Sequence, residues 1–330
     1  MSVPVVAFFN NKGGVGKTSL VYHLAWMFSD LGVKTLAADL DPQANLTSAF
    51  LDEDQLEDIW SDEPQSTTLY GCIRPLVEGD SDIAPPATQE VSSSLALLAG
   101  SISFSSFEDE LSQTWHSAMS GQPRAFKVWS AVWRSMQQAA NLNGALVILM
   151  DLGPNLGAIN RASLIAADHV VVPMSPDLYS LQGLRNLGPS FKSWRRDWND
   201  RVARKPALNF QLPAGRMQPL GYVVMQHGVR FDRPVKAYDK WAGRIPGEYR
   251  KHVLEDFLSV RVPLQTDPHL LALLKHYRSL MPLAQEARKP MFHLKSADGA
   301  IGAHFNAVQE CRKDFEQLAL KILARTGIQP

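Results

Sequence analysis

A glycine-rich stretch near the start of the chain constrains its fold more than any other feature. Residues 10–19 are Asn-Asn-Lys-Gly-Gly-Val-Gly-Lys-Thr-Ser, which follow an apolar run at residues 3–9 and precede a helical pattern at residues 20–28. A strand, a glycine-rich loop and a helix start, in this order, are the context of a phosphate-binding loop. Glycines allow backbone N–H groups to turn toward an anion, and the helix N-terminus adds partial positive charge. The alternative is an ordinary turn, which the lysine and threonine directly after the last glycine disfavour.

The side chains of this loop have distinct expected roles. Lys17 would reach the β- and γ-phosphates of a nucleoside triphosphate, and the Thr18 hydroxyl would hold Mg²⁺. The backbone around Val15 would surround the phosphates. The predicted nucleotide-binding residues of the loop are Lys12, Gly13, Gly14, Val15, Gly16, Lys17, Thr18 and Ser19.

Composition limits the class of protein. The chain has 330 residues, of which 45% are hydrophobic, enough for one large α/β domain or two smaller ones. Cys72 and Cys311 are far apart and indicate neither a disulfide framework nor a metal cluster, which fits a reducing cytoplasm. We find no basic leader region with a cleavage site, and no apolar run approaches the ~20 residues that span a bilayer. These features predict a cytoplasmic protein.

The charged residues are distributed unevenly, although the formal net charge is zero. Acidic residues dominate between Asp39 and Gln113, where Arg74 is the one basic residue. Basic residues dominate between Lys192 and Lys251. Such an asymmetry indicates that one face of the protein binds a polyanion.

Two further apolar strands are each followed by aspartate. Residues 33–38 precede Asp-Leu-Asp-Pro-Gln-Ala-Asn at residues 39–45, and residues 145–150 precede Asp151. Carboxylates at the C-terminal ends of parallel strands face the ligand crevice of an open α/β sheet. The second segment has the Walker B arrangement, in which Asp151 would bind Mg²⁺ through water near the loop threonine. The alternative for the first segment is a solvated Asp-Pro turn.

Taken in order, these segments resemble the ParA/MinD family of P-loop ATPases. Lys12 lies directly before the glycine pair, and Asn11 stands where a strict phosphate-loop pattern has its first glycine, as in the deviant Walker A motif of the ParA branch. Residues 39–45 are similar to the family's D-x-D-P-Q-x-N signature. A strand near Val171 and residues 279–292, which resemble the segment that closes over the base, follow in the family order.

This resemblance implies a fold. We expect an α/β P-loop NTPase with a doubly wound, mostly parallel sheet flanked by helices. The resemblance further implies a single domain over residues 1–330, with family-atypical helical or loop insertions around residues 52–94 and 195–262.

The resemblance also implies roles for individual residues. Lys12 would cross to the nucleotide of the partner subunit, and Asp41 would position or activate the attacking water. Where relatives have an asparagine that recognises adenine, this chain has Met225 and Gln226, and Gln226 is the predicted contact. Gly153 and Asn155 replace residues of the family's Asp-x-Pro-Pro-Ser segment. The predicted catalytic residues are Lys12, Lys17 and Asp41, and the predicted metal-binding residues are Thr18, Asp39 and Asp151.

Partners follow from the same resemblance. We expect a homodimer with ATP and Mg²⁺ at its interface, which binds DNA without sequence preference and partitions or positions a DNA or protein cargo. A ParB-like or other adaptor would stimulate slow hydrolysis, and the protein would be cytoplasmic and nucleoid-associated. Clustered arginine and lysine bind DNA phosphates through counterion release. The predicted DNA contacts are Arg195, Arg196, Arg204, Lys205, Arg230, Arg233, Lys236, Arg250 and Lys251.

Other functions stay open at this point. A MinD-like relative would bind a membrane through its C-terminal helix, but the apolar stripe at residues 305–322 favours core packing. A metabolic P-loop ligase would use the same loop, although it has little use for a basic region. An iron–sulfur reductase of the superfamily would need paired cysteines, which the chain lacks. Because the chain enters its first strand directly, we expect no N-terminal helix-turn-helix. The cargo could be a plasmid, a chromosome origin, a protein assembly or a defence complex.

Overall fold

The computed structural model describes residues 2–61, 67–79, 82–225, 240–257, 262–277 and 279–329. These residues form an eight-stranded sheet in the order β3-β4-β2-β5-β1-β6-β7-β8. Neighbouring strands are parallel except for β3, which is antiparallel to β4. The strands are β1 (Val5–Phe8), β2 (Thr35–Asp39), β3 (Gln89–Ser92), β4 (Leu95–Leu98), β5 (Val147–Asp151), β6 (His169–Met174), β7 (Gln218–Met225) and β8 (Leu270–Leu274).

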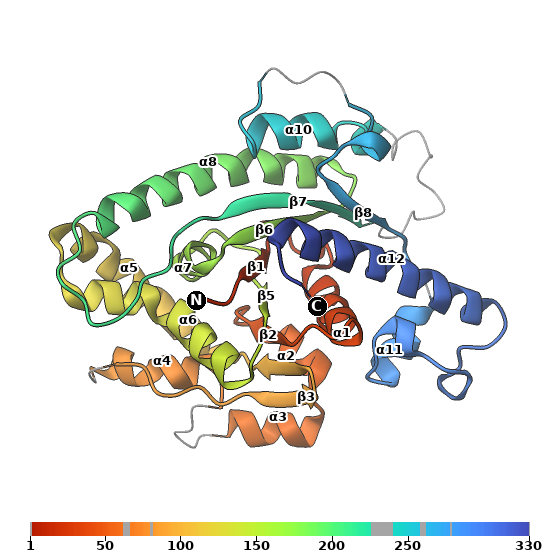
Figure 1. Cartoon of the computed structure of the whole chain (residues 1–330), viewed down its shortest axis with the longest axis horizontal. Coiled ribbons are helices and arrows are strands. Elements are labelled where there is room, and N and C mark those ends of the chain that lie inside the picture. The colour runs from red at the N-terminus through yellow and green to blue at the C-terminus, as the bar shows by residue number, and fades with distance from the viewer. Residues whose placement is uncertain are drawn as a thin grey trace.

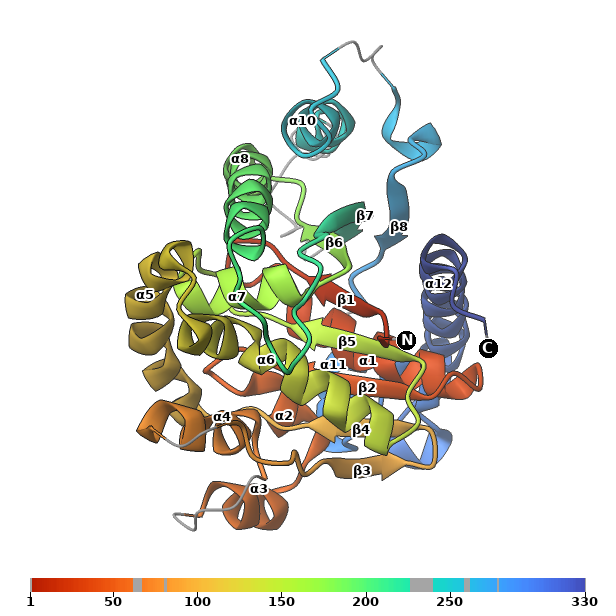
Figure 2. The same ribbon diagram turned by 60° about the vertical axis from the view of Figure 1, so that its left-hand side comes forward.

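Helices cover both faces of this sheet (Figure 1). Figure 2 shows α5, α6, α7 and α8 on one face and α1, α11 and α12 on the other. The helices are α1 (Lys17–Asp30), α2 (Asn45–Phe50), α3 (Glu53–Trp60), α4 (Leu69–Glu78), α5 (Phe107–Ser117), α6 (Pro123–Leu142), α7 (Ala158–Ala166), α8 (Leu178–Val202), α10 (Ile245–His252), α11 (Leu280–Glu286) and α12 (Ala303–Thr326).

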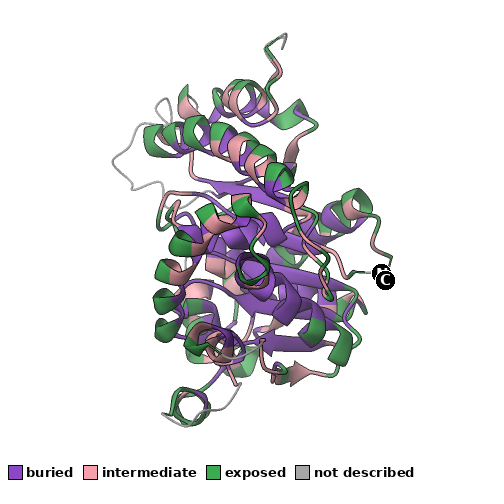
Figure 3. Ribbon diagram, turned by 90° about the vertical axis from the view of Figure 1, so that its left-hand side faces the viewer, coloured by how far each residue is buried: buried purple, intermediate pink, exposed green. Residues whose placement is uncertain are grey.

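The two-sided cover explains why the central strands are apolar throughout. β1, β2 and β5 are buried along their whole length, as Figure 3 shows for the centre of the molecule. A parallel sheet between two helical layers has no solvated face, so its strands do not alternate apolar with polar residues. Trp129 and Phe191 belong to the core on one face, and Phe28 and Phe315 to the core on the other.

The strand order places the chemistry at one edge of the sheet. β1 lies between β5 and β6, and the register of β2 with β5 puts Asp39 beside Asp151. Asn10 follows the end of β1 at the same edge. Ligands of open α/β sheets bind at this carboxyl edge, where the strand order reverses.

The predicted fold class is confirmed, and the differences from prediction lie in particular elements. β3 is a polar edge strand, which has no apolar pattern to predict it, whereas β8 is a short apolar run that is only partly buried. α8 begins at Leu178, where the Asp177 side chain caps it by accepting a hydrogen bond from the Ser180 N–H. The single domain and its insertions stay predictions.

The C-terminal helix packs against the sheet as expected. Val308, Phe315, Leu318 and Ile322 of α12 are buried, whereas Phe305 is exposed. Among the described residues, no helix is long and apolar enough to cross a membrane.

Candidate nucleotide-binding site

The loop between β1 and α1 has the backbone that an anion site requires. Gly14 and Gly16 have φ of 70° and 85°, in the left-handed region that glycine adopts without strain. Gly16 precedes α1, and no side chain caps the helix there. The N–H groups of the first helical turn are therefore available to a bound anion, which the helix dipole also favours.

Lys17 points back onto this loop. Its ammonium donates to the Asn10 carbonyl at 3.2 Å and to the Lys12 carbonyl at 3.3 Å. Burial lowers the pKa of Lys17, while the charges of Asp151 and Asp41 act in the opposite direction. A phosphate that displaced the two carbonyls would offer this buried cation a charged partner.

The two buried carboxylates at the strand ends differ in their partners. Asp39 accepts hydrogen bonds from the Thr47 N–H and hydroxyl, at 2.8 and 2.7 Å, and from the Asp41 N–H at 3.2 Å. Asp151 is fully buried, and neither of its oxygens has a hydrogen-bond partner within 3.5 Å among the described residues, although Thr18 and Lys17 lie close enough to lower its pKa. Burial raises the pKa of both carboxyls, and the charge of Asp39 adds to the effect at Asp151.

An unpartnered buried carboxylate beside the loop fits a cation ligand. Burying a charge is costly, and the nearby Lys17 does not offset the effects of burial and of Asp39 on the Asp151 pKa, so a bound cation would stabilise this carboxylate. Mg²⁺ in nucleotide sites keeps several waters and binds one or two carboxylates together with the substrate phosphates. Such a site needs no cluster of three or more protein ligands, and the described residues contain no such cluster. Asp151 with Thr18 therefore fits Mg²⁺, whereas Asp39 is engaged by Thr47.

Asp41 belongs to the loop that follows β2 and lies near the segment that follows β5. Its Oδ1 accepts a hydrogen bond from the Gln43 N–H at 3.0 Å, and the carbonyl accepts one from Ala44 at 2.8 Å. A Cβ at Gly153 would lie 3.2 Å from Asp41 Oδ1, so glycine leaves this carboxylate its place. Ala44 has a φ of 52°, a strained value for a residue with a side chain.

Lys12 forms an ion pair within its own chain. Its ammonium contacts Oδ2 of Asp177, the residue that caps α8. Next to this pair, Leu178 and Tyr179 are 51% and 73% exposed. Large apolar side chains thus lie in solvent beside the lysine that is expected to act in a partner subunit.

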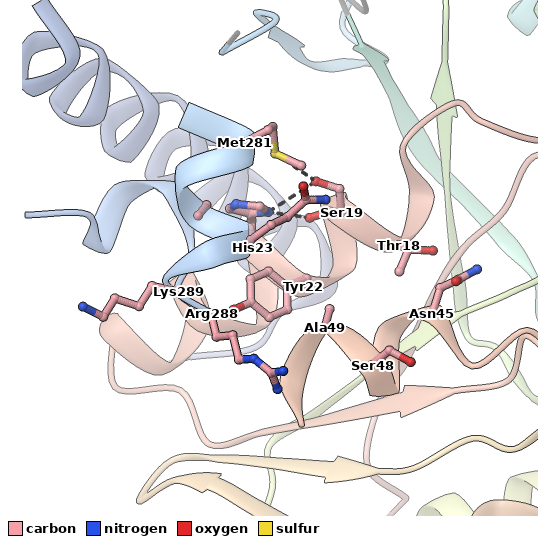
Figure 4. Close-up of a pocket in the computed structure, with 12 residues that line it drawn as sticks. Thr18, Ser19, Tyr22, His23, Asn45, Ser48, Ala49, Met281, Arg288 and Lys289 are labelled. Atoms are coloured by element: carbon pink, nitrogen blue, oxygen red, sulfur yellow. Dashed lines mark hydrogen bonds between the residues drawn. The ribbon is translucent and has the colours of Figure 1, made fainter. Parts of the chain in front are cut away.

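A cavity of about 540 Å³ adjoins the phosphate loop (Figure 4). Figure 4 shows Ser19 and Tyr22 of α1, Ser48 of α2 and Met281 of α11 around it. Arg288, with a φ of 48°, closes one side and donates a hydrogen bond to the Leu51 carbonyl at 2.8 Å. Apolar walls with a few polar groups are typical of sites that hold a flat organic ring.

The predicted DNA contacts have different surroundings. Arg195 donates a hydrogen bond to the Met217 carbonyl, and Arg196 is exposed and pairs with Asp197. Arg250 instead pairs with the buried Asp267, which also accepts from the Tyr222 hydroxyl at 2.6 Å. The remaining described residues of this set, Arg204, Lys205 and Lys251, are exposed. Gln226, Arg230, Arg233 and Lys236 lie outside the described residues.

Sequence reasoning missed several residues of this site. The Ser-Pro-Asp segment before α8 is a recognisable helix start, which could have identified Asp177 as a cap. Its ion pair with Lys12 joins residues 165 positions apart, and no local pattern signals it. No local pattern signals that Thr47 donates hydrogen bonds to Asp39. Tyr22, which lines the cavity, has the sequence pattern of a core residue.

The fold and the loop define a P-loop protein, and the comparisons with known proteins give its family. A family model described as an AAA domain matches residues 3–203, which is more than half of the chain. IncC of Escherichia coli is 31% identical over 178 residues, 54% of this chain and 43% of IncC. Soj of Thermus thermophilus, a chromosome-partitioning ATPase, is 29% identical over 199 residues, 60% of this chain and 65% of Soj. The chain belongs to the ParA/MinD family of P-loop ATPases.

Two solved structures share the fold over nearly the whole chain. A protein from Corynebacterium diphtheriae, DIP2308, has a TM-score of 0.72 and 23% identity, with 98% of both chains covered. McdA of Cyanothece, solved as a variant in complex with ATP, has a TM-score of 0.60 and 18% identity, with 100% and 98% covered. At these identities the likeness establishes the fold alone. The chain spans less than two thirds of the length of the curated relatives named above.

Proposed function

We propose that this chain is a Mg²⁺-dependent ATPase that uses ATP to dimerise and to bind DNA. The observation that carries the proposal is the buried carboxylate of Asp151, which has no hydrogen-bond partner within 3.5 Å among the described residues and lies near Thr18 and Lys17 of the phosphate loop. Lys17 and the loop backbone would bind the phosphates, and Thr18 and Asp151 would hold Mg²⁺. When bound, Mg²⁺ neutralises phosphate charge. Asp41 would orient the water that attacks the γ-phosphate.

The cavity beside the loop would take the nucleoside. It begins at Thr18 and Ser19, so a triphosphate held by the loop would extend directly into it. Tyr22 and Met281 supply apolar contacts for a purine, and Arg288 lies at its edge. Gln226 stays a predicted contact to the base.

A second copy of the chain would complete the site. Lys12 would leave Asp177 and contact the phosphates of the partner subunit's ATP, as the family's deviant motif implies. The exposed Leu178 and Tyr179 lie next to it, and burying them would favour dimerisation. ATP would therefore be both ligand and part of the interface.

The basic surface would bind DNA through phosphates. Its described members are Arg196 on α8, Arg204 and Lys205 just after the end of α8, and Lys251 on α10. Arg250 would hold α10 in place through Asp267. Two curated relatives are named as chromosome-partitioning proteins, which supports partition or positioning of a cargo. A ParB-like adaptor would stimulate hydrolysis, as the family resemblance implies. The protein would act in the cytoplasm, on the nucleoid.

The membrane and ligase alternatives have less support. A MinD-like membrane helix would need a free apolar face, but the stripe of α12 is mostly buried against the sheet. A ligase would have no use for the basic residues of α8 and α10.

Retention on random-sequence DNA tests the proposal. We expect retention with ATP and Mg²⁺ but not without nucleotide, because the dimer presents the basic surface twice. Four exposed cations on each subunit, and so about eight on the dimer, predict a roughly 10⁴-fold loss of affinity between about 50 and about 200 mM salt. Lys251→Ala should weaken retention, whereas Lys313→Ala, at an exposed position of α12, should not. Binding that ignores both ATP and salt would contradict the proposal.

A further inference from the structure

Glu108 connects two helices that are far apart in the sequence. Its carboxylate accepts hydrogen bonds from the Ala158 N–H at 2.5 Å and from the Ile159 N–H at 2.8 Å. Glu108 is the second residue of α5, and Ala158 and Ile159 are the first two residues of α7. N–H groups in the first turn of a helix have no partner within the helix, and a negative charge there is favourable. The two helices are neighbours in Figure 2.

Gly157 makes room for this contact. A Cβ at this position would lie 2.6 Å from Oε1 of Glu108. The φ of Gly157 is −69°, which any residue adopts, so glycine is needed for space alone. Gly157 also provides no side-chain cap, and α7 takes its cap from α5.

The first turn of α7 also fastens the segment that follows Asp151. The buried Asn160 donates hydrogen bonds from Nδ2 to the Gly153 carbonyl at 2.9 Å and to the Asn155 carbonyl at 2.8 Å. Gly153 in turn lies beside Asp41, because a Cβ at this position would be 3.2 Å from Asp41 Oδ1. Hydrogen bonds therefore connect Glu108 through the first turn of α7 to Gly153, which adjoins Asp41.

We propose that Glu108 is a positioning residue for ATP hydrolysis, and this inference rests on the proposed ATPase function. Glu108 fixes the start of α7, and Asn160 passes that position on to Gly153 and Asp41. Glu108 itself does not line the nucleotide site. Its loss would leave two helix N–H groups without their acceptor and allow the segment after Asp151 to shift. Small displacements of a reacting group reduce turnover more than binding.

Glu108→Gln tests this role, because it keeps the size of the side chain but removes the charge and one acceptor. We expect kcat for ATP to fall by about tenfold or more while the ATP dissociation constant changes by less than about twofold. Without nucleotide, the amides of residues 157–160 should exchange with deuterium about tenfold faster. Asp109→Asn removes the neighbouring, exposed carboxylate of α5 and should match the wild-type protein in both measurements.

Two outcomes would overturn the proposal. A Glu108→Gln protein with a lower Tm but wild-type kcat would show that Glu108 only caps a helix. Wild-type exchange at residues 157–160 would show that the contact does not hold the turn. Because the exchange measurement needs no ATP, failure of this contact is distinguishable from failure of the proposed ATPase function.

Discussion

The ammonium of Lys12 is paired with Asp177, the residue that caps α8. Lys12 is the lysine that marks the deviant phosphate loop, and its expected target is the nucleotide of a partner subunit. Within one chain the lysine is therefore held by its own α8, one residue before the exposed Leu178 and Tyr179. Dimerisation would exchange this carboxylate for phosphate oxygens.

Asp177→Asn should promote dimerisation. Asparagine can still accept the Ser180 N–H and cap α8, but it no longer holds Lys12 by charge. We expect the ATP concentration for half-maximal dimerisation, followed by light scattering, to fall by about three- to tenfold. Asp197→Asn, which removes an exposed ion pair with Arg196 on the same helix, is the control and should change nothing. A higher ATP requirement in Asp177→Asn would mean that the pair supports the dimer.

Lys17→Ala should abolish ATP binding. Lys17 is buried in the loop and donates hydrogen bonds to two carbonyl oxygens, which a phosphate would replace. Equilibrium binding of a fluorescent ATP analogue should weaken by at least about a hundredfold. Lys34→Ala, at an exposed position before β2, should bind normally. Unchanged affinity in Lys17→Ala would refute the assignment of the phosphate loop.

Asp41→Ala should bind ATP without turning it over. The carboxylate lies against Gly153 and would orient the attacking water, whereas the phosphates are bound by other groups. Phosphate release should fall by at least about a hundredfold, while ATP remains bound. Turnover at the wild-type rate would exclude Asp41 as the residue that positions water.

His23 should make the stability of the fold depend on pH. It is buried, and its ring donates to the Ser19 carbonyl at 2.7 Å and accepts from the Met291 N–H at 3.2 Å. Burial lowers the pKa of His23 to about 4, so the unfolded chain, with a pKa of about 6.5, takes up the proton first as the pH falls. The stabilisation is present above about pH 6.5 and is lost toward about pH 4, by roughly 3 kcal/mol in total.

Urea unfolding at several pH values checks this expectation. The difference in the free energy of unfolding between the wild-type protein and His23→Gln should shrink as the pH falls through this window. His116→Gln, at an exposed position of α5, should show no such trend. A difference that does not vary with pH would mean that His23 is not held neutral by the fold.

Local sequence patterns predict the fold class and the phosphate site, because each depends on contiguous residues. The loop at residues 10–19 lies between a strand and a helix as expected, and Asp39 and Asp151 adjoin in register. The patterns do not distinguish the two carboxylates. Asp39 accepts hydrogen bonds from Thr47, whereas no described residue donates one to Asp151 within 3.5 Å. Tertiary contacts decide such details.

The charge pattern predicts a basic region but not the use of each cation. Arg250 and Lys251 are adjacent in sequence, yet Arg250 pairs with the buried Asp267 and Lys251 faces solvent. A helix turns neighbouring residues to different sides, so a count of charges cannot separate an anchor from a surface contact. Pairs such as Lys12 with Asp177 and Glu108 with Ala158 are also missed, because their members are far apart in the sequence and no local pattern joins them.

The most direct test of the central claim is the mass of the protein with and without ATP. Asp41→Ala should be used, because it would hold ATP without hydrolysing it. Analytical ultracentrifugation should give a mass near 36.6 kDa without nucleotide and twice that mass with ATP and Mg²⁺. The same protein with Lys12→Ala added should stay at 36.6 kDa under both conditions. A mass that ATP does not change, or a dimer that forms without Lys12, would contradict the account.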